Sequence, residues 1–202
     1  MGTAEPGEFG PPAATVPPIP EHGTSHVSVV DKQGNAASLT TTIESAFGSF
    51  HMVDGFLLNN ELTDFTAEYD PQDPNRIEPG KRPRSSMSPT IVLKDGKPVL
   101  VTGSPGGSRI ISAVTQIIVD VIDYRMDIAA AVAAPRIHHQ WLPDEVRIER
   151  GFPDEVLAEL KAKGHKLVEP LGYSSANSIV VTTNGLLGAP DPRTRGSEAA
   201  GY

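Results

Sequence analysis

The sequence contains no cysteine. This absence excludes disulfide bonds, metal sites built on thiolates and a cysteine nucleophile, and it leaves the redox compartment open. Long apolar runs are missing too, because no stretch approaches the roughly 18 apolar residues that a membrane-spanning helix needs. No signal-peptide pattern follows Met1, so we expect any export signal to lie on another segment.

The sequence also lacks clusters of positive charge. The 17 Lys and Arg residues stand against 25 Asp and Glu residues, which gives a formal net charge of −8 at pH 7 without a basic run. A phosphate backbone is bound by clustered Lys and Arg, so the composition argues against a nucleic-acid partner. Small neutral or acidic substrates stay open.

Proline and glycine are abundant, at 19 residues each, but they are unevenly placed. Six of the prolines fall within residues 1–23, a stretch with almost no apolar periodicity. We therefore expect residues 1–23 to form an extended lead and residues 24–202 to form one domain.

Strand and helix signals begin directly after this lead. The predicted hairpins are residues 25–43 with a turn at 32–35, residues 90–101 with Asp95-Gly96 as the turn, and residues 178–189 joined through Asn184-Gly185. The predicted helices are 109–124 with Ser108 as N-cap, 128–134 and 154–163, and Glu145–Glu149 is a predicted strand. Residues 66–84 are rich in turn formers and predict a loop. Sheets covered by helices are the expected result.

Thr24 stands where the lead meets the first strand. A threonine hydroxyl is a weak nucleophile unless a base is adjacent, and a free α-amine on the same residue can supply that base. Gly23 would suit a strained bond that cleaves itself, because glycine tolerates backbone conformations that other residues avoid. On these residues alone, a structural threonine at a strand start is the more ordinary interpretation.

Several longer motifs occur in one order along the chain. They are Thr24–Ala36, Ser38–Glu44, Leu58–Phe65, Gly80–Thr90, Gly103–Gly107 and Ala134–Arg136. Together they closely resemble the γ-glutamyltransferase family from the processing site onward, over about residues 24–202. The resemblance identifies the chain as the small catalytic subunit segment of such an enzyme, preceded by the end of the large-subunit region. Its expected fold is α+β, one half of the four-layer αββα sandwich of N-terminal-nucleophile hydrolases, completed by the large subunit.

The resemblance implies a role for each matching residue. Cleavage between Gly23 and Thr24 would free Thr24 as the nucleophile, and Thr42 would position its amine and hydroxyl. The implied substrate-binding residues are Glu44, Glu61 and Asp64 for the donor α-ammonium group and Ser85 and Ser86 for its α-carboxylate. Gly106 and Gly107 would offer backbone N–H groups to the oxyanion. Taken singly, the carboxylates also fit a solvated turn and the glycines a tight turn or an anion nest.

The implied activity is transfer of a γ-glutamyl group from glutathione or another γ-glutamyl amide to water, an amino acid or a peptide. The implied partner is a large subunit, from the same precursor or encoded separately, and no metal or organic cofactor is needed. The family favours a periplasmic or extracellular location, although the chain itself carries no sign of its compartment.

Three features depart from the family pattern. Arg84 stands where Leu usually precedes the serine pair, and its charge could alter the preference for donor or acceptor. The chain between Asp64 and Lys81 is short, which predicts a site without a lid and open to bulkier donors. The arginine that holds the donor α-carboxylate belongs to the large subunit, which this chain does not contain.

Two alternatives stay open at this point: a cephalosporin or glutaryl acylase of the same family, and an inactive truncated fragment. His138 and His139 do not suggest a metal site, because neighbouring residues on an extended segment point to opposite faces. His26 lies beside the nucleophile but on the other strand face from Ser25, so we assign it no catalytic role.

Overall fold

The computed structural model describes residues 23–172, 174–194 and 196–201. The chain divides into two compact units, whose described parts are residues 23–24 with 42–85, and residues 25–41 with 86–172, 174–194 and 196–201. We call these the first and the second unit and describe each separately. Apart from Gly23, the predicted lead 1–23 lies outside the described residues.

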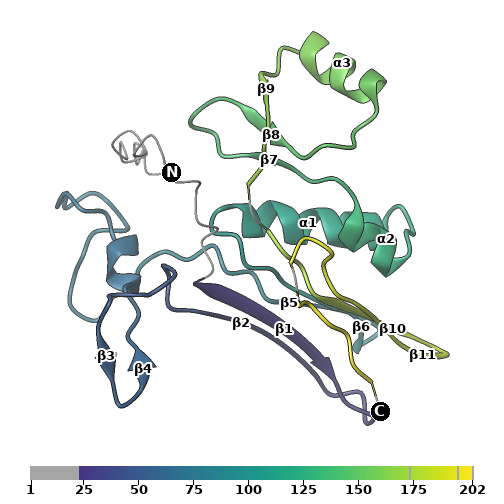
Figure 1. Cartoon of the computed structure of the whole chain (residues 1–202), viewed down its shortest axis with the longest axis horizontal. Helices are drawn as coiled ribbons and strands as arrows, with labels where there is room; N and C mark the ends of the chain where they lie inside the picture. The colour runs from purple at the N-terminus through teal and green to yellow at the C-terminus, as the bar shows by residue number, and fades with distance from the viewer. Residues whose placement is uncertain (1–22, 173, 195, 202) are drawn as a thin grey trace. The chain divides into compact units, whose positions relative to one another are not determined.

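A four-stranded antiparallel sheet forms the centre of the second unit (Figure 1). Its strands are β5 (Thr90–Lys94), β6 (Lys97–Thr102), β10 (Ser178–Thr182) and β11 (Gly185–Ala189), in the order β11-β10-β6-β5. Asp95 and Gly96 both have positive φ, as a two-residue hairpin turn requires, so the predicted 90–101 hairpin is confirmed. The 178–189 hairpin is confirmed as well, except that Thr182 pairs with Gly185 and the turn lies at residues 183–184.

Helices α1 (Arg109–Ile122) and α2 (Ile128–Ala133) lie along one face of this sheet (Figure 1). The core between them consists of Leu100, Ile117, Ile128, Val132, Ala176 and Ala189. The predicted apolar stripe of α1 is buried at Ile110, Val114 and Ile117, whereas Ile111 is exposed. Ser108 occupies the N-cap position without a side-chain cap bond, while Asp127 caps α2 by accepting from the N–H groups of Ala129 and Ala130.

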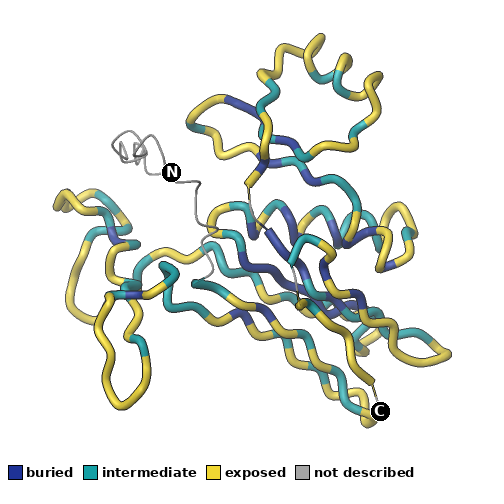
Figure 2. Tube along the Cα trace, in the orientation of Figure 1, coloured by how far each residue is buried: buried dark blue, intermediate teal, exposed yellow. Residues whose placement is uncertain are grey.

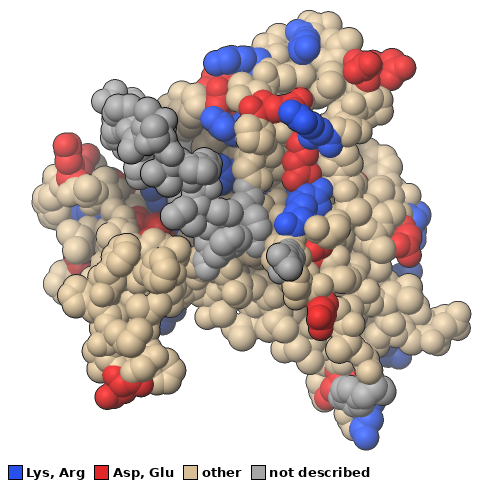
Figure 3. All heavy atoms as spheres, in the orientation of Figure 1, with Lys and Arg blue, Asp and Glu red and all other residues tan. Residues whose placement is uncertain are grey.

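A smaller three-stranded sheet also belongs to the second unit. It contains β7 (Ile137–His139), β8 (Val146–Ile148) and β9 (Leu167–Val168), and α3 (Asp154–Ala162) precedes β9. The strand at β8 and the helix at α3 were predicted, whereas β7 and β9 are too short to leave a pattern. Around β8 and α3 acidic and basic side chains lie close together, as in the ion pair between Arg147 and Glu145 (Figure 3).

The predicted first hairpin is confirmed as β1 (Thr24–Val30) and β2 (Ala36–Thr42). Residues 25–41 of this hairpin belong to the second unit, and two polar contacts hold them beside β6 and β10. The Ser38 hydroxyl donates to the carbonyl of Thr102, and the Asn177 amide donates to the carbonyl of His26.

The first unit consists mainly of short elements and turns. It holds β3 (Met52–Val53), β4 (Phe56–Leu57), the 3₁₀ helix η1 (Glu61–Asp64) and the predicted loop over 66–84. Among its described residues Phe65 is the only buried apolar side chain, and the β3–β4 hairpin is largely exposed (Figure 2). None of the helices in the described part of the chain has the length and apolar character that a membrane crossing demands.

Candidate active site

Thr24 lies at a dense hydrogen-bonded junction in the first unit. Its Oγ1 is 2.8 Å from Oγ1 of Thr42, at the end of β2. The carbonyl oxygen of Gly23 accepts hydrogen bonds from the N–H of Ile43 at 2.9 Å and from the Thr42 hydroxyl at 3.1 Å. The bond between Gly23 and Thr24 therefore has its carbonyl held by two donors and a hydroxyl next to it.

The direction of the hydrogen bond between the two threonines follows from counting protons. The Thr42 oxygen accepts from the N–H of Glu44 at 2.8 Å, and its single proton goes to the carbonyl of Gly23. A hydroxyl has one donor and two acceptor positions, so the remaining position of Thr42 accepts the proton of Thr24. This direction leaves the lone pairs of the Thr24 oxygen free for attack on a carbonyl.

Gly23 suits this junction for a steric reason. A Cβ atom at residue 23 would lie 2.1 Å from the carbonyl oxygen of Glu44 and 2.7 Å from that of Ser45. A residue with a Cβ would therefore clash with these two carbonyl oxygens unless the backbone moved.

A group of carboxylates lies close by within the same unit. Glu61 and Asp64 lie on η1, and both Asp64 and Glu44 raise the pKa of Glu61, after burial as the largest cause. Oε1 of Glu61 is buried and has no hydrogen-bond partner in the described part of the chain. A buried carboxylate oxygen without a partner is unfavourable, so this group of negative charges is suited to a bound cation.

Asn60 supports this carboxylate group. Its side-chain amide donates to Glu44, and its side-chain oxygen accepts from the N–H and the hydroxyl of Ser45 at 3.1 Å each. Glu44 itself has a φ of 71°, a strained value for a residue with a side chain, and such strain gathers at functional sites. Asn60 lies within the Leu58–Phe65 motif, but its residue type alone predicts no role. The N–H of Ile43 leaves no signal in the sequence, because it belongs to the backbone.

The serine pair follows the 66–84 loop. Ser85 is exposed and ends the first unit, whereas Ser86 is half-buried and begins the second. Arg84, the residue that departs from the family pattern, is exposed.

Gly106 and Gly107 belong to the second unit and form the turn before α1. Both have positive φ, and their carbonyl groups accept from the N–H groups of Arg109 and Ile110. The described residues supply no acceptor for the N–H groups of these glycines. Buried Ser104 holds the turn in place, since its oxygen accepts from the N–H of Ser175 and its proton goes to the carbonyl of Pro105. Such a turn can offer N–H groups to an anion.

The His26 side chain makes hydrogen bonds inside the fold. Its Nδ1 lies 2.8 Å from the Thr40 hydroxyl and its Nε2 lies 3.0 Å from the Ser28 hydroxyl, which itself donates to the carbonyl of Asn177. Burial lowers the pKa of His26 to about 4, so the ring stays neutral near pH 7. A Cβ at residue 103 would meet this ring, which explains Gly103.

The two neighbouring histidines of β7 have different surroundings, as expected for an extended segment. His138 is buried and bonded to Ser112 and Gln140, whereas His139 is exposed and bonded to Asp144. Among the described residues no group of three or more His, Asp or Glu could hold a metal ion.

The structure thus places seven of the predicted site residues in the first unit and the other three in the second. Gly23, Thr24, Thr42, Glu44, Glu61, Asp64 and Ser85 lie in the first unit, and Ser86, Gly106 and Gly107 lie in the second.

The chain is similar to known proteins of one family. Residues 4–201 match the family model described as gamma-glutamyltranspeptidase. A similar relative is the glutathione hydrolase proenzyme of Escherichia coli, which is 49% identical over 196 residues, covering 92% of this chain and 34% of the relative. The chain therefore spans about a third of the length of the curated relatives that it matches.

Solved structures show the same fold. A mutant of the Helicobacter pylori gamma-glutamyltranspeptidase is 48% identical with a TM-score of 0.76, and the match covers 84% of this chain and 99% of that chain. A cephalosporin acylase from Bacillus halodurans is 27% identical with a TM-score of 0.76, over 84% of this chain and 32% of that one. The predicted N-terminal-nucleophile hydrolase fold is confirmed by these neighbours. The chain belongs to the gamma-glutamyltranspeptidase family.

Proposed function

We propose that this chain is the catalytic small-subunit segment of a self-cleaving γ-glutamyltransferase that also hydrolyses glutathione. Residues 1–23 would be the end of the large-subunit region, and residues 24–202 the small subunit. The observation that carries the proposal is the set of hydrogen bonds joining Thr24, Thr42 and the carbonyl of Gly23.

The first stage is cleavage of the precursor. The Thr24 hydroxyl adds to the Gly23 carbonyl carbon and gives its proton to Thr42, which gives its own proton to the Gly23 oxygen, while the N–H of Ile43 stabilises the charge that develops on that oxygen. The bond to the Thr24 nitrogen then breaks, the nitrogen takes up a proton, and an ester joins Gly23 to the Thr24 oxygen. This step frees the α-amine of Thr24, and water then hydrolyses the ester, which restores the Thr24 hydroxyl and leaves a carboxylate on residue 23.

The second stage uses that amine as the base. Its ordinary pKa is about 8, so a neutral fraction is present near pH 7. Thr24 attacks the γ-carbonyl of the donor, the N–H groups of Gly106 and Gly107 stabilise the oxyanion, and the amine product leaves with a proton. Water then releases glutamate, or an amino acid or peptide accepts the γ-glutamyl group. No metal or organic cofactor enters either step.

Donor binding would rest on opposite charges. Glu61, Asp64 and Glu44 would bind the α-ammonium group, which supplies the partner that the buried Oε1 of Glu61 lacks within the described chain. Ser85 and Ser86 would bind the α-carboxylate, together with an arginine of the large subunit.

The large subunit is the proposed partner because the first unit leaves its apolar residues uncovered. Phe50, Phe56, Met52, Val53 and Leu62 are exposed by 53–80%. A monomeric protein rarely exposes so many apolar side chains in one short segment, and such patches mark protein contacts. The curated relatives continue for about twice the length of this chain beyond the matched part, which is enough for a covering subunit.

A cephalosporin or glutaryl acylase is the second candidate, favoured by the likeness to the Bacillus halodurans enzyme and by the short 65–80 segment. Rates with γ-glutamyl-p-nitroanilide and glutaryl-p-nitroanilide separate the two, because these donors differ only in the α-amino group. The assembled enzyme should prefer the γ-glutamyl donor by about tenfold or more, given the charge-assisted bonds at stake. Equal rates, or a preference for the glutaryl donor, would favour the acylase.

An inactive fragment is the candidate from another class. Its cleavage and turnover would both be absent after assembly with a large subunit. For the compartment, the family favours a periplasmic or extracellular location. For the acceptor, it favours an amino acid or a peptide.

A further inference from the structure

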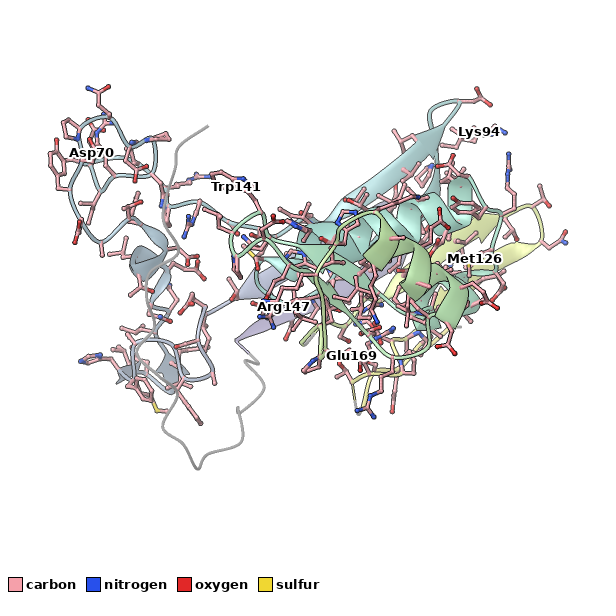
Figure 4. The ribbon with its side chains drawn as sticks, turned by 90° about the horizontal axis from the view of Figure 1, so that it is seen from above. Asp70, Lys94, Met126, Trp141, Arg147 and Glu169 are labelled. Carbon is pink, nitrogen blue, oxygen red and sulfur yellow. The ribbon has the colours of Figure 1, made fainter. Side chains whose placement is uncertain are left out.

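The 66–84 loop joins two parts of the proposed donor site within the first unit. Asp64 stands at its start and Ser85 at its end, and Asp70 marks its outer part (Figure 4). Asp64 would contact the donor ammonium group and Ser85 the donor carboxylate, which are attached to the same carbon atom. The distance between the two ends of the loop therefore decides whether both groups can be held at once.

Asn75 connects the two ends with a single side chain. Its Nδ2 donates to the carbonyl oxygen of Asp64 at 2.8 Å, and its Oδ1 accepts from the N–H of Arg84 at 2.9 Å. These bonds reach the residue that carries the ammonium-binding carboxylate and the residue next to Ser85. An amide is the side-chain group with both a donor and an acceptor in one rigid plane, so it suits this bridge.

The backbone around Asn75 is also held. Its N–H donates to the Asp73 carboxylate at 2.7 Å, and its carbonyl accepts from the N–H of Thr66 at 3.2 Å. Asn75 is half-buried, and neighbouring Arg76 pairs with Glu78 at 2.9 Å. The bridge is thus fixed from both sides, which limits how far the two ends of the loop can separate.

We propose that Asn75 is a positioning residue that sets the spacing between Asp64 and Ser85 and thereby selects donors that carry both an α-ammonium and an α-carboxylate group. This inference rests on the proposed function. It adds a residue that touches no substrate and that acts through the two residues it holds.

The test compares variants of the processed enzyme, assembled with its large subunit, on three p-nitroanilide donors. The γ-glutamyl donor has both groups, the glutaryl donor lacks the amine, and the γ-aminobutyryl donor lacks the carboxylate. For Asn75→Ala we expect KM for the γ-glutamyl donor to rise about tenfold with kcat changed less than about threefold, and KM for the other two to change less than about threefold. A donor held at one end alone does not depend on the spacing.

Asn75→Asp is the second variant, because it keeps the acceptor for Arg84 and loses the donor to Asp64. We expect a rise in KM for the γ-glutamyl donor that lies between those of the wild type and Asn75→Ala. Gln72→Ala is the matched control: Gln72 is exposed in the same loop, and it is its backbone N–H that donates a hydrogen bond to the Asp70 carboxylate. It should leave all three KM values unchanged.

The outcomes separate the inference from the function on which it rests. A wild-type enzyme without γ-glutamyl turnover would overturn the proposed function. The wild type could instead be active while Asn75→Ala loses kcat on all donors alike, or raises the three KM values equally. Either result would overturn the positioning role alone. If intact mass shows that Asn75→Ala is not processed, Asn75→Asp decides, and equal changes on all donors in that variant count against the proposal.

Discussion

Thr42 is the residue on which both proposed steps depend, because its hydroxyl contacts the nucleophile and the carbonyl to be cleaved. Thr42→Val keeps the side-chain shape and removes the hydroxyl. We expect cleavage after Gly23 to slow by about a hundredfold, the usual loss when one oxyanion donor is removed. Electrophoresis of the precursor over time measures this rate, and Thr42→Ser, which keeps the hydroxyl, should stay within about tenfold of the wild type. Unchanged cleavage in Thr42→Val would remove Thr42 from the mechanism.

The raised pKa of Glu61 leads to a prediction about how the activity depends on pH. Burial and the nearby charges of Asp64 and Glu44 raise the pKa of its carboxyl group above the ordinary value. The donor ammonium group prefers the ionised carboxylate, so kcat/KM for a γ-glutamyl donor should rise with pH through that raised pKa. Glu61→Gln should lower kcat/KM about tenfold to a hundredfold and remove this acidic limb. A pH profile with the same limb in the variant would assign the limb to another group.

The lowered pKa of His26 leads to a prediction about how the stability of the fold depends on pH. Its pKa is lowered from 6.5 to about 4 by burial, so between these values the unfolded chain binds more protons than the folded one. The free energy of unfolding should therefore fall as the pH drops from about 6.5 to about 4, by at most about 3.4 kcal/mol for this group. Urea unfolding of the assembled protein at several pH values measures the slope. His26→Gln should flatten it, whereas His51→Gln, at an exposed histidine, should not.

At the scale of elements, the β5–β6 hairpin offers a matched pair of leucines. Leu100 is fully buried in the core under α1 and α2, and Leu93 is 58% exposed on the neighbouring strand. Leu100→Ala should cost about 2–5 kcal/mol because it leaves a cavity, and Leu93→Ala should cost less than about 1 kcal/mol. Thermal unfolding of the assembled protein compares them, and similar losses would mean that the two leucines are buried to a similar extent in the assembly.

The elements also show which parts of the fold the sequence could predict. Asp95-Gly96 between two apolar runs has one favourable local structure, and the apolar spacing of α1 is a strong helix signal, so both were predicted close to their observed bounds. The β3–β4 hairpin and β9 have only two residues per strand, which is too short for a periodic pattern. The order of strands in the sheet depends on contacts between residues far apart in the chain, which no local pattern contains.

The same division holds for the site. The place of Thr24 between lead and strand drew attention to it, but its role as nucleophile, like the roles of the carboxylates and serines, was assigned through the family resemblance. The bridge made by Asn75 and the two donors on the Gly23 carbonyl involve backbone groups, which every residue carries and no sequence motif marks. Their roles could be inferred only from the structure.

At the scale of the whole molecule, the described chain explains the precursor junction and leaves an apolar surface on the first unit. Both features fit the proposal that this chain is a segment of a longer enzyme in which a large subunit covers the β3–β4 region. On this account Thr24 stays latent until the chain is assembled and cleaved.

The most direct test is the intact mass of the full precursor, or of this chain incubated with its large subunit. We predict a product that begins at Thr24, appears before γ-glutamyl turnover, and is absent in Thr24→Ala together with that turnover. A chain that stays uncut, or a Thr24→Ala variant that is cleaved at the same bond, would contradict the assignment of Thr24 as the nucleophile.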